Sequence, residues 1–211
     1  MALVFLPPWL RVNPQAESAA NSVFTDRGSG PGGGVPAQVS RWSSRAPMPT
    51  SRGRLAAATV GGLIYAIGGD AEGGITAVVE AFDPAQNVWQ IRAAKPTAVS
   101  NIGAVAVDGL IYVPGGMLED GQVTAVMEVY DPTEDTWSVR ASLPTPVCAY
   151  AVAAVEGRIY VFGGWDGERY LDSVFIYDVK KDVWESGTPM SVARGFSAAG
   201  VIGDRIYVVG G

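Results

Sequence analysis

Residues 159–164 read IYVFGG, a run of strand-forming side chains that ends in two glycines. The chain contains three further versions of this stretch, IYAIGG at 64–69, IYVPGG at 111–116 and IYVVGG at 206–211. Their first glycines follow one another at intervals of 47, 48 and 47 residues. A regular interval of this length indicates a chain built from structural repeats.

Tryptophan follows the same interval. Trp42, Trp89, Trp137 and Trp184 are again separated by 47, 48 and 47 residues, and each lies 26 residues before the next glycine pair. Since two unrelated residue types keep one period, the repeat reflects the fold rather than a bias in composition. The glycines are expected to serve the backbone, through positive φ or close approach of another strand. A phosphate-binding loop would need a following helix and a G-x-G-x-x-G spacing, and neither is present.

Each repeat divides into four short strand-like segments. In the third repeat these are residues 150–155, 158–162, 173–178 and a last segment around Trp184. The second segment is rich in β-branched and aromatic residues, and Glu156-Gly157 before it suits a two-residue hairpin turn. The first segment consists mainly of small residues, which fit where strands crowd around an axis. Four antiparallel strands in a repeat of this length predict a blade of a β-propeller.

The spacing that recurs in each repeat resembles the Kelch repeat: a glycine pair, then Tyr or Phe followed by Asp, then Trp six residues after that Asp. The matching residues are Gly68, Gly69, Phe82, Asp83, Trp89, Gly115, Gly116, Tyr130, Asp131, Trp137, Gly163, Gly164, Tyr177, Asp178 and Trp184, with Gly210 and Gly211 opening a fourth copy. This resemblance implies a β-propeller that is used mostly to bind other proteins. It also implies that a minority of relatives are enzymes, including copper oxidases with a galactose oxidase-like propeller and a bacterial sialic-acid mutarotase.

The domain organisation follows from these repeats. We expect an N-terminal tail and Gly/Pro/Ser-rich linker over residues 1–38 and an all-β propeller of four-stranded Kelch blades over residues 39–211. Three full repeats, a half repeat and an orphan outer strand around Trp42 predict an incomplete ring. Alternatively, the VSRW segment at 39–42 joins the C-terminal half-blade and closes a four-bladed ring.

Composition excludes several classes of site. The chain has no histidine and a single cysteine, Cys148, so His-ligated metals, His-dependent catalytic triads and an intrachain disulfide are ruled out. The net charge of −6 argues against nucleic-acid binding and anionic membranes, which need clustered Lys and Arg. We expect no cofactor and no membrane insertion by residues 39–211, and the sequence does not indicate a compartment. Cys148, without a histidine, is expected to be an inert small residue.

Strand direction predicts which face of the propeller recognises a ligand. The loops after the glycine pairs lie on the same side as the segments that lead into each first strand. These loops are long and differ between repeats, and we call this side the long-loop face. The opposite side, the tight-turn face, carries short and similar turns such as DG at 108–109 and DPTED at 131–135. Varied loops on a rigid scaffold are typical of binding sites.

Ten residues of the long-loop face are candidate partner contacts. They are Arg52, Arg54, Asn101, Tyr150, Trp165, Asp166, Arg169, Tyr170, Arg194 and Phe196. Trp165 falls outside the tryptophan interval, so it is either a contact residue or a loop anchor. The arginines predict a local basic spot on an otherwise acidic protein.

Three functions are compatible with this pattern. The favoured one is a protein-interaction scaffold or adaptor module, whose Arg and aromatic side chains hold an acidic or Tyr-containing segment of a protein or peptide partner. The second is a carbohydrate-active or sugar-binding propeller of the sialic-acid mutarotase type, with Asp166 as acid or base and Arg169 holding an anionic group. The third is a purely structural segment. No catalytic constellation is evident, which favours a protein that is not an enzyme.

Overall fold

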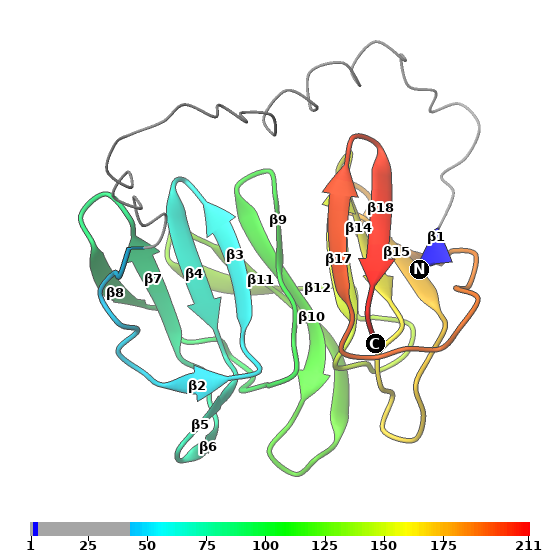
Figure 1. Cartoon of the computed structure of the whole chain (residues 1–211), viewed down its shortest axis with the longest axis horizontal. Coiled ribbons are helices and arrows are strands. Elements are labelled where there is room, and N and C mark those ends of the chain that lie inside the picture. The colour runs from blue at the N-terminus through cyan, green and yellow to red at the C-terminus, as the bar shows by residue number, and fades with distance from the viewer. Residues whose placement is uncertain (1, 4–42) are drawn as a thin grey trace, which may run out of the picture.

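The computed structural model describes residues 2–3 and 43–211, and within these residues every regular element is a β-strand (Figure 1). Each of the three complete repeats forms one four-stranded antiparallel sheet. The first sheet contains β3 (Ala56–Val60), β4 (Leu63–Ile67), β7 (Val79–Asp83) and β8 (Val88–Arg92). The second contains β9 (Val105–Val107), β10 (Leu110–Met117), β11 (Val123–Asp131) and β12 (Thr136–Arg140). The third contains β13 (Ala151–Val155), β14 (Arg158–Phe162), β15 (Val174–Asp178) and β16 (Val183–Ser186).

The fourth repeat contributes β17 (Ala198–Ile202) and β18 (Arg205–Val209). The short strand β1 (Ala2–Leu3) pairs with β18, with Ala2 opposite Val208. It lies within the predicted tail and adds a third strand to this sheet. The predicted outer strand around Trp42, and with it the alternative in which residues 39–42 close the ring, falls outside the described residues. The all-β, propeller-type fold is confirmed, while the 38/39 boundary and the open ring stay predictions.

The sheets are arranged as blades. Their first strands β3, β9, β13 and β17 are neighbours in that order. Short turns join the first two strands of each sheet at the top of Figure 1, and the long loops lie at the bottom. In the β9–β10 turn, Asp108 and Gly109 have φ of 50° and 82°, as a two-residue hairpin requires. A small sheet of β2 (Arg52–Gly53), β5 (Asp70–Ala71) and β6 (Gly74–Ile75) extends the long-loop side of the first blade.

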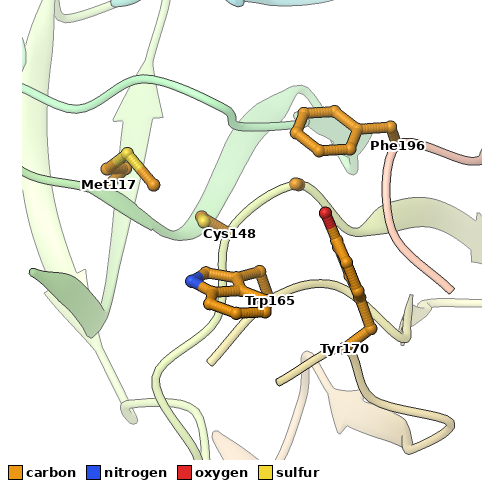
Figure 2. Close-up of a pocket in the computed structure, with 6 residues that line it drawn as sticks. Met117, Cys148, Trp165, Tyr170 and Phe196 are labelled. Atoms are coloured by element: carbon orange, nitrogen blue, oxygen red, sulfur yellow. The ribbon is translucent and has the colours of Figure 1, made fainter. Parts of the chain in front are cut away.

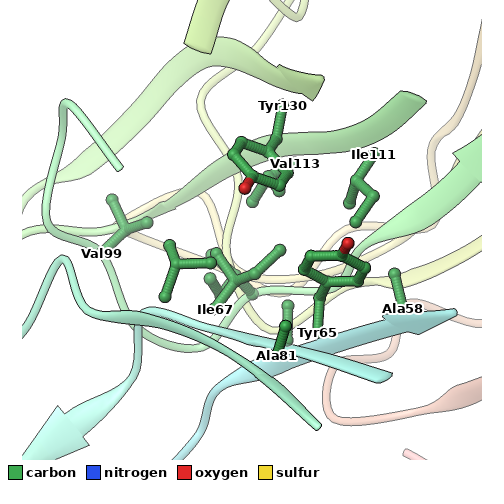
Figure 3. Packing of buried hydrophobic residues seen from close by; sticks show 11 residues of the cluster. Ala58, Tyr65, Ile67, Ala81, Val99, Ile111, Val113 and Tyr130 are labelled. Carbon is green, nitrogen blue, oxygen red and sulfur yellow. The ribbon is translucent and has the colours of Figure 1, made fainter. Parts of the chain in front are cut away.

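Buried side chains fill the space between adjacent blades. Figure 3 shows the cluster between the first and second sheets, where the rings of Tyr65 and Tyr130 lie 5.7 Å apart between their centroids. Ala56 and Ala58 of the innermost strand belong to the same cluster. Ala151 and Ala153 of the third sheet belong to a similar cluster with Ile206 and Val208 of the fourth repeat. The small residues predicted for the first strands therefore pack between blades in the first and third sheets.

The repeated tryptophans join each blade to the segment that enters it. Ala93, which follows the first blade, donates its N–H to Asp135 Oδ1 at 2.8 Å and accepts a hydrogen bond from Trp137 Nε1 at 2.9 Å. The Trp137 ring also packs on Tyr130, with centroids 5.1 Å apart. The same two hydrogen bonds, which we call the tryptophan clasp, recur at Ala46 with Asn87 and Trp89, and at Ala141 with Asp182 and Trp184.

The glycine pairs bring each blade close to the backbone of the next. A Cβ at Gly115 would lie 2.3 Å from the Val147 carbonyl oxygen, and Gly116 donates its N–H to that oxygen at 2.9 Å. At Gly163 a Cβ would lie 2.3 Å from the Arg194 carbonyl oxygen. The first glycines have positive φ, 65° at Gly115 and 58° at Gly163. Both predicted roles of the glycines, positive φ and close approach, are confirmed.

Candidate functional site

A chain of backbone hydrogen bonds links the blades on the long-loop face. Four equivalent residues, Arg54, Asn101, Ala149 and Phe196, precede the first strands and have φ between 52° and 54°. The N–H of Asn101 donates to the Arg54 carbonyl at 2.9 Å. Ala149 and Phe196 each donate in the same way to the preceding member at 2.7 Å. The fold thus fixes the backbone at this position while its side chain differs in every blade.

A second backbone contact ties the long loops to this chain of residues. Cys148 and Trp165 exchange two hydrogen bonds, 2.9 Å from Cys148 N and 2.8 Å from Trp165 N. Ser100 and Met117 are joined by the same exchange in the preceding blade. Trp165 therefore occupies a repeated backbone position although its side chain is not repeated.

An apolar pocket of about 180 Å³ opens on the long-loop face between these elements (Figure 2). Its lining residues come from the second, third and fourth repeats and are Met117, Cys148, Ala149, Trp165, Tyr170 and Phe196. The rings of Trp165 and Tyr170 meet edge to face, 5.0 Å apart at an angle of 62°. Phe196 is 67% exposed and Tyr170 is 47% exposed. Large aromatic side chains are thus presented to solvent around an apolar hollow.

Small residues and a tight loop shape this pocket. A Cβ at Gly195 would lie 2.6 Å from the Tyr170 ring, so glycine at this position makes room for the tyrosine. The loop from Trp165 to Tyr170 closes through Asp166, whose Oδ1 accepts the N–H of Glu168 and of Arg169, both at 2.8 Å. These hydrogen bonds, with that of Arg169 the stronger influence, hold the pKa of Asp166 below its usual range.

Cys148 lines the pocket with an uncharged thiol. The residue is buried, and burial raises the pKa of its thiol to about 11. A thiol with this pKa is protonated at neutral pH and is a poor nucleophile. Its position agrees with the inert role expected from the absence of histidine.

The four predicted arginines do not form a common basic spot. Arg52 was expected on the surface, but its side chain is 0% exposed and its Nη1 lies 2.6 Å from Glu80 Oε2. Arg194 donates from Nη1 to the Gly210 carbonyl at 2.7 Å. Only Arg54 and Arg169 have largely exposed side chains, 64% and 79%.

Both exposed arginines lie beside carboxylates. Arg54 Nη1 is 2.9 Å from Asp70 Oδ2, and Arg169 Nε is 3.7 Å from Asp166 Oδ2. The long loops also hold five exposed acidic residues, Glu72, Glu119, Asp120, Glu168 and Asp172. The predicted local basic spot is therefore wrong, because the four arginines are buried, beside carboxylates or bonded to a carbonyl, and acidic side chains outnumber basic ones on this face.

Two further candidates are buried. Tyr150 donates its hydroxyl hydrogen to the Pro114 carbonyl and accepts the Gly103 N–H at 3.2 Å, so it ties the second blade to the third. Burial raises its pKa. Asn101 is also buried, with Nδ2 3.6 Å from Met117 Sδ. Neither side chain is presented to a partner.

The structure therefore brings Trp165, Tyr170 and Phe196 together and adds residues that the sequence did not single out. Met117 and Ala149 line the same pocket. Met117 could have been found, because it follows the second glycine of its pair as Trp165 does. Within the described residues, no group of three or more His, Cys, Asp or Glu side chains could hold a metal ion. No helix in that part of the chain is long and apolar enough to cross a membrane.

Comparisons with known proteins agree with this architecture. The Kelch motif matches three stretches, residues 51–95, 98–144 and 146–191. Kelch-like protein 36 from Bos taurus is 45% identical over 42 residues, which are 20% of this chain and 7% of that protein. The structure of YjhT superposes with a TM-score of 0.72 and 19% identity over 80% of this chain and 62% of that one. The chain thus spans less than two thirds of either relative, and the likeness to YjhT concerns the fold alone.

Proposed function

Because this chain belongs to the family of the Kelch motif, which matches three successive stretches of it, we propose that it is a protein-interaction module that holds a partner on its long-loop face. The Kelch motifs, one relative named Kelch-like and a propeller-type fold support a general role in protein binding. The finer proposal, a scaffold or adaptor that uses this particular face, rests on the residues around the pocket.

One observation carries the proposal: exposed aromatic side chains surround an apolar pocket on a fixed backbone. Phe196 and Tyr170 are both more than one third exposed, and Trp165 packs against Tyr170 in the wall of the same pocket. Aromatic residues that are exposed in the free protein and clustered around a hollow are typical of the energetic centres of protein interfaces. The hydrogen-bonded backbone beneath them limits the ordering cost of binding.

The carbohydrate-active alternative receives less support from this site. Its proposed acid or base, Asp166, already accepts two backbone N–H groups, and its lowered pKa keeps it ionised at neutral pH. A general acid needs a raised pKa. The side chains that line the pocket offer one hydroxyl, that of Tyr170, whereas a sugar presents many. These features suit an apolar side chain better than a sugar.

Affinity capture with the full chain tests the proposal. Wild-type protein, Tyr170→Ser/Phe196→Ser and a matched control, Val88→Ser/Val183→Ser, would be immobilised and exposed to extract from the source cell. The control removes two exposed apolar side chains next to the turns of the tight-turn face. We expect proteins that bind the wild type and the control but not the pocket variant. Equal capture by all three, or loss with the control alone, would contradict the proposal.

A further inference from the structure

We propose that the pocket holds one apolar anchor, an aromatic or large aliphatic side chain, from a partner segment whose flanking residues are lysine or arginine. This inference rests on the proposed function and specifies the chemistry of the partner. It reverses the acidic partner expected from the sequence, because Arg52 is buried, Arg54 and Arg169 lie beside carboxylates, and Arg194 donates to a backbone carbonyl.

The pocket itself selects an apolar group. Its lining consists of three aromatic rings, a thioether, a buried protonated thiol and a methyl group. The only oxygen among these side chains is the Tyr170 hydroxyl. A charged or strongly hydrated group would lose its water here and find only the Tyr170 hydroxyl and the Trp165 indole N–H as side-chain partners. Aromatic and sulfur-containing walls favour an apolar or aromatic guest.

The size of the pocket points to one side chain rather than a free small molecule. Its volume is about 180 Å³. Pockets that enclose drug-sized ligands commonly measure about 300–1,000 Å³. A single anchor side chain would therefore fill it, and the rest of the ligand would lie across the surrounding loops.

Those surrounding loops carry negative charge. Glu119 and Asp120 follow Met117 by two and three residues, Glu168 stands between Trp165 and Tyr170, and Asp172 follows Tyr170. All four are exposed, and Glu119 Oε2 also accepts the N–H of Ile75 at 2.6 Å. Two basic residues lie in the segments that line the pocket: Arg169, whose charge is offset by Asp166, and Arg194, which donates to the Gly210 carbonyl. Because the four carboxylates outnumber these two arginines, the loops attract cationic segments and repel acidic ones.

Peptide display on the full chain tests this proposal. A random peptide library would be selected on wild-type protein, and each enriched peptide would be retested on Tyr170→Ser/Phe196→Ser and on Val88→Ser/Val183→Ser. We expect enriched peptides to carry one Phe, Trp, Leu or Met flanked by Lys or Arg. We also expect binding to survive in the control and to disappear in the pocket variant.

Synthetic versions of the best peptide then measure separately how much the apolar anchor and the flanking charges contribute to the affinity. Replacing its anchor with glycine should weaken binding at least tenfold, and Glu168→Lys/Asp172→Lys should weaken it severalfold with less sensitivity to salt. Charge reversal away from the pocket, Glu134→Lys/Glu185→Lys, should have little effect. Acidic flanks among peptides that require the pocket would overturn the basic-partner inference and leave the interaction role standing. Peptides lost only in the Val88/Val183 variant would overturn both, and no enrichment would count against the inference.

Discussion

The two faces of this molecule use repetition differently. On the tight-turn face, backbone and side chains recur together: Asp83, Asp131 and Asp178 each accept two N–H groups of their own turn through Oδ1. On the long-loop face the glycine pairs and the backbone conformation recur, whereas the side chains of the loops do not. Arg54, Asn101, Ala149 and Phe196 share one conformation and one hydrogen-bond chain but no chemical character.

This difference separates what the fold requires from what it leaves open. On the tight-turn face the repeated side chains make the structural contacts, so the sequence must repeat. On the long-loop face backbone groups make those contacts, and the side chains can vary without loss of the architecture. The pocket lies among these variable side chains, where Trp165, Tyr170 and Phe196 come together.

The largest effect is expected inside the blades. Lys95 and Glu128 form a buried ion pair in the second blade, where burial lowers the pKa of Lys95 although Glu128 opposes this. In the third blade the equivalent residues are Leu143 and Phe175. Lys95→Met leaves a buried carboxylate unpaired and should lower the free energy of unfolding by about 3–5 kcal/mol.

The matched double variant Lys95→Leu/Glu128→Phe copies the third blade and should restore most of that loss. Urea unfolding of the three proteins measures both effects. Two equally unstable variants would mean that the second blade cannot accept the apolar arrangement of the third.

The second-largest loss of stability is expected when a tryptophan clasp is removed. Trp137→Ala removes a half-buried ring and its hydrogen bond to Ala93, and should cost about 3 kcal/mol. Trp165→Ala, on the open pocket, should cost about 1 kcal/mol or less. Chemical denaturation compares the two variants. Similar losses would show that the non-repeated tryptophan has a structural role as large as the repeated one.

A smaller effect concerns pH. The Tyr130 hydroxyl, 2.5 Å from Asp135 Oδ1, and then the Ala93 N–H lower the pKa of Asp135, and Tyr177 and Ala141 do the same for Asp182. A carboxylate with a lowered folded-state pKa stabilises the protein above its unfolded pKa of about 3.9, and this contribution is lost as the pH falls through the folded-state pKa. The first blade has Asn87 at the equivalent position.

Asp135→Asn/Asp182→Asn should therefore cost at most about 1 kcal/mol per site at pH 7, since a neutral hydrogen bond replaces a charge-assisted one. The difference from the wild type should shrink as the pH falls below about 3.9 and then through the folded-state pKa values of the two carboxylates. Unfolding midpoints at several pH values measure this. A constant difference across the range would contradict the assigned pKa shifts.

The smallest effect is expected for the exposed arginines. Arg54→Met/Arg169→Met removes two surface pairs and should change stability by no more than about 0.5 kcal/mol. Arg52→Met should instead resemble Lys95→Met, because Glu80 would lose its buried partner. Thermal melts of the two proteins distinguish these cases, and equal melting temperatures would show that the buried pair adds nothing.

The features that could be predicted from the sequence are those that recur with the repeat of 47 or 48 residues. Trp137 and the glycine pairs recur at fixed intervals, so their roles in the blades could be inferred before the structure. The burial of Arg52 could not, because it depends on Glu80 facing the same interior space from another strand. The one hint in the sequence was that Glu80 and Glu128 occupy equivalent positions with apolar residues on both sides. The pocket depends on Gly195 admitting the Tyr170 ring, a steric fact without a sequence pattern.

Amide hydrogen exchange of the full chain, with and without a peptide selected on it, tests most directly whether the variable face is the binding face. We expect slower exchange over residues 117–122, 148–149, 165–172 and 194–196, with little change elsewhere. Slower exchange confined to the turns at 84–87, 132–135 and 179–182 would place binding on the tight-turn face and contradict a binding site on the long-loop face.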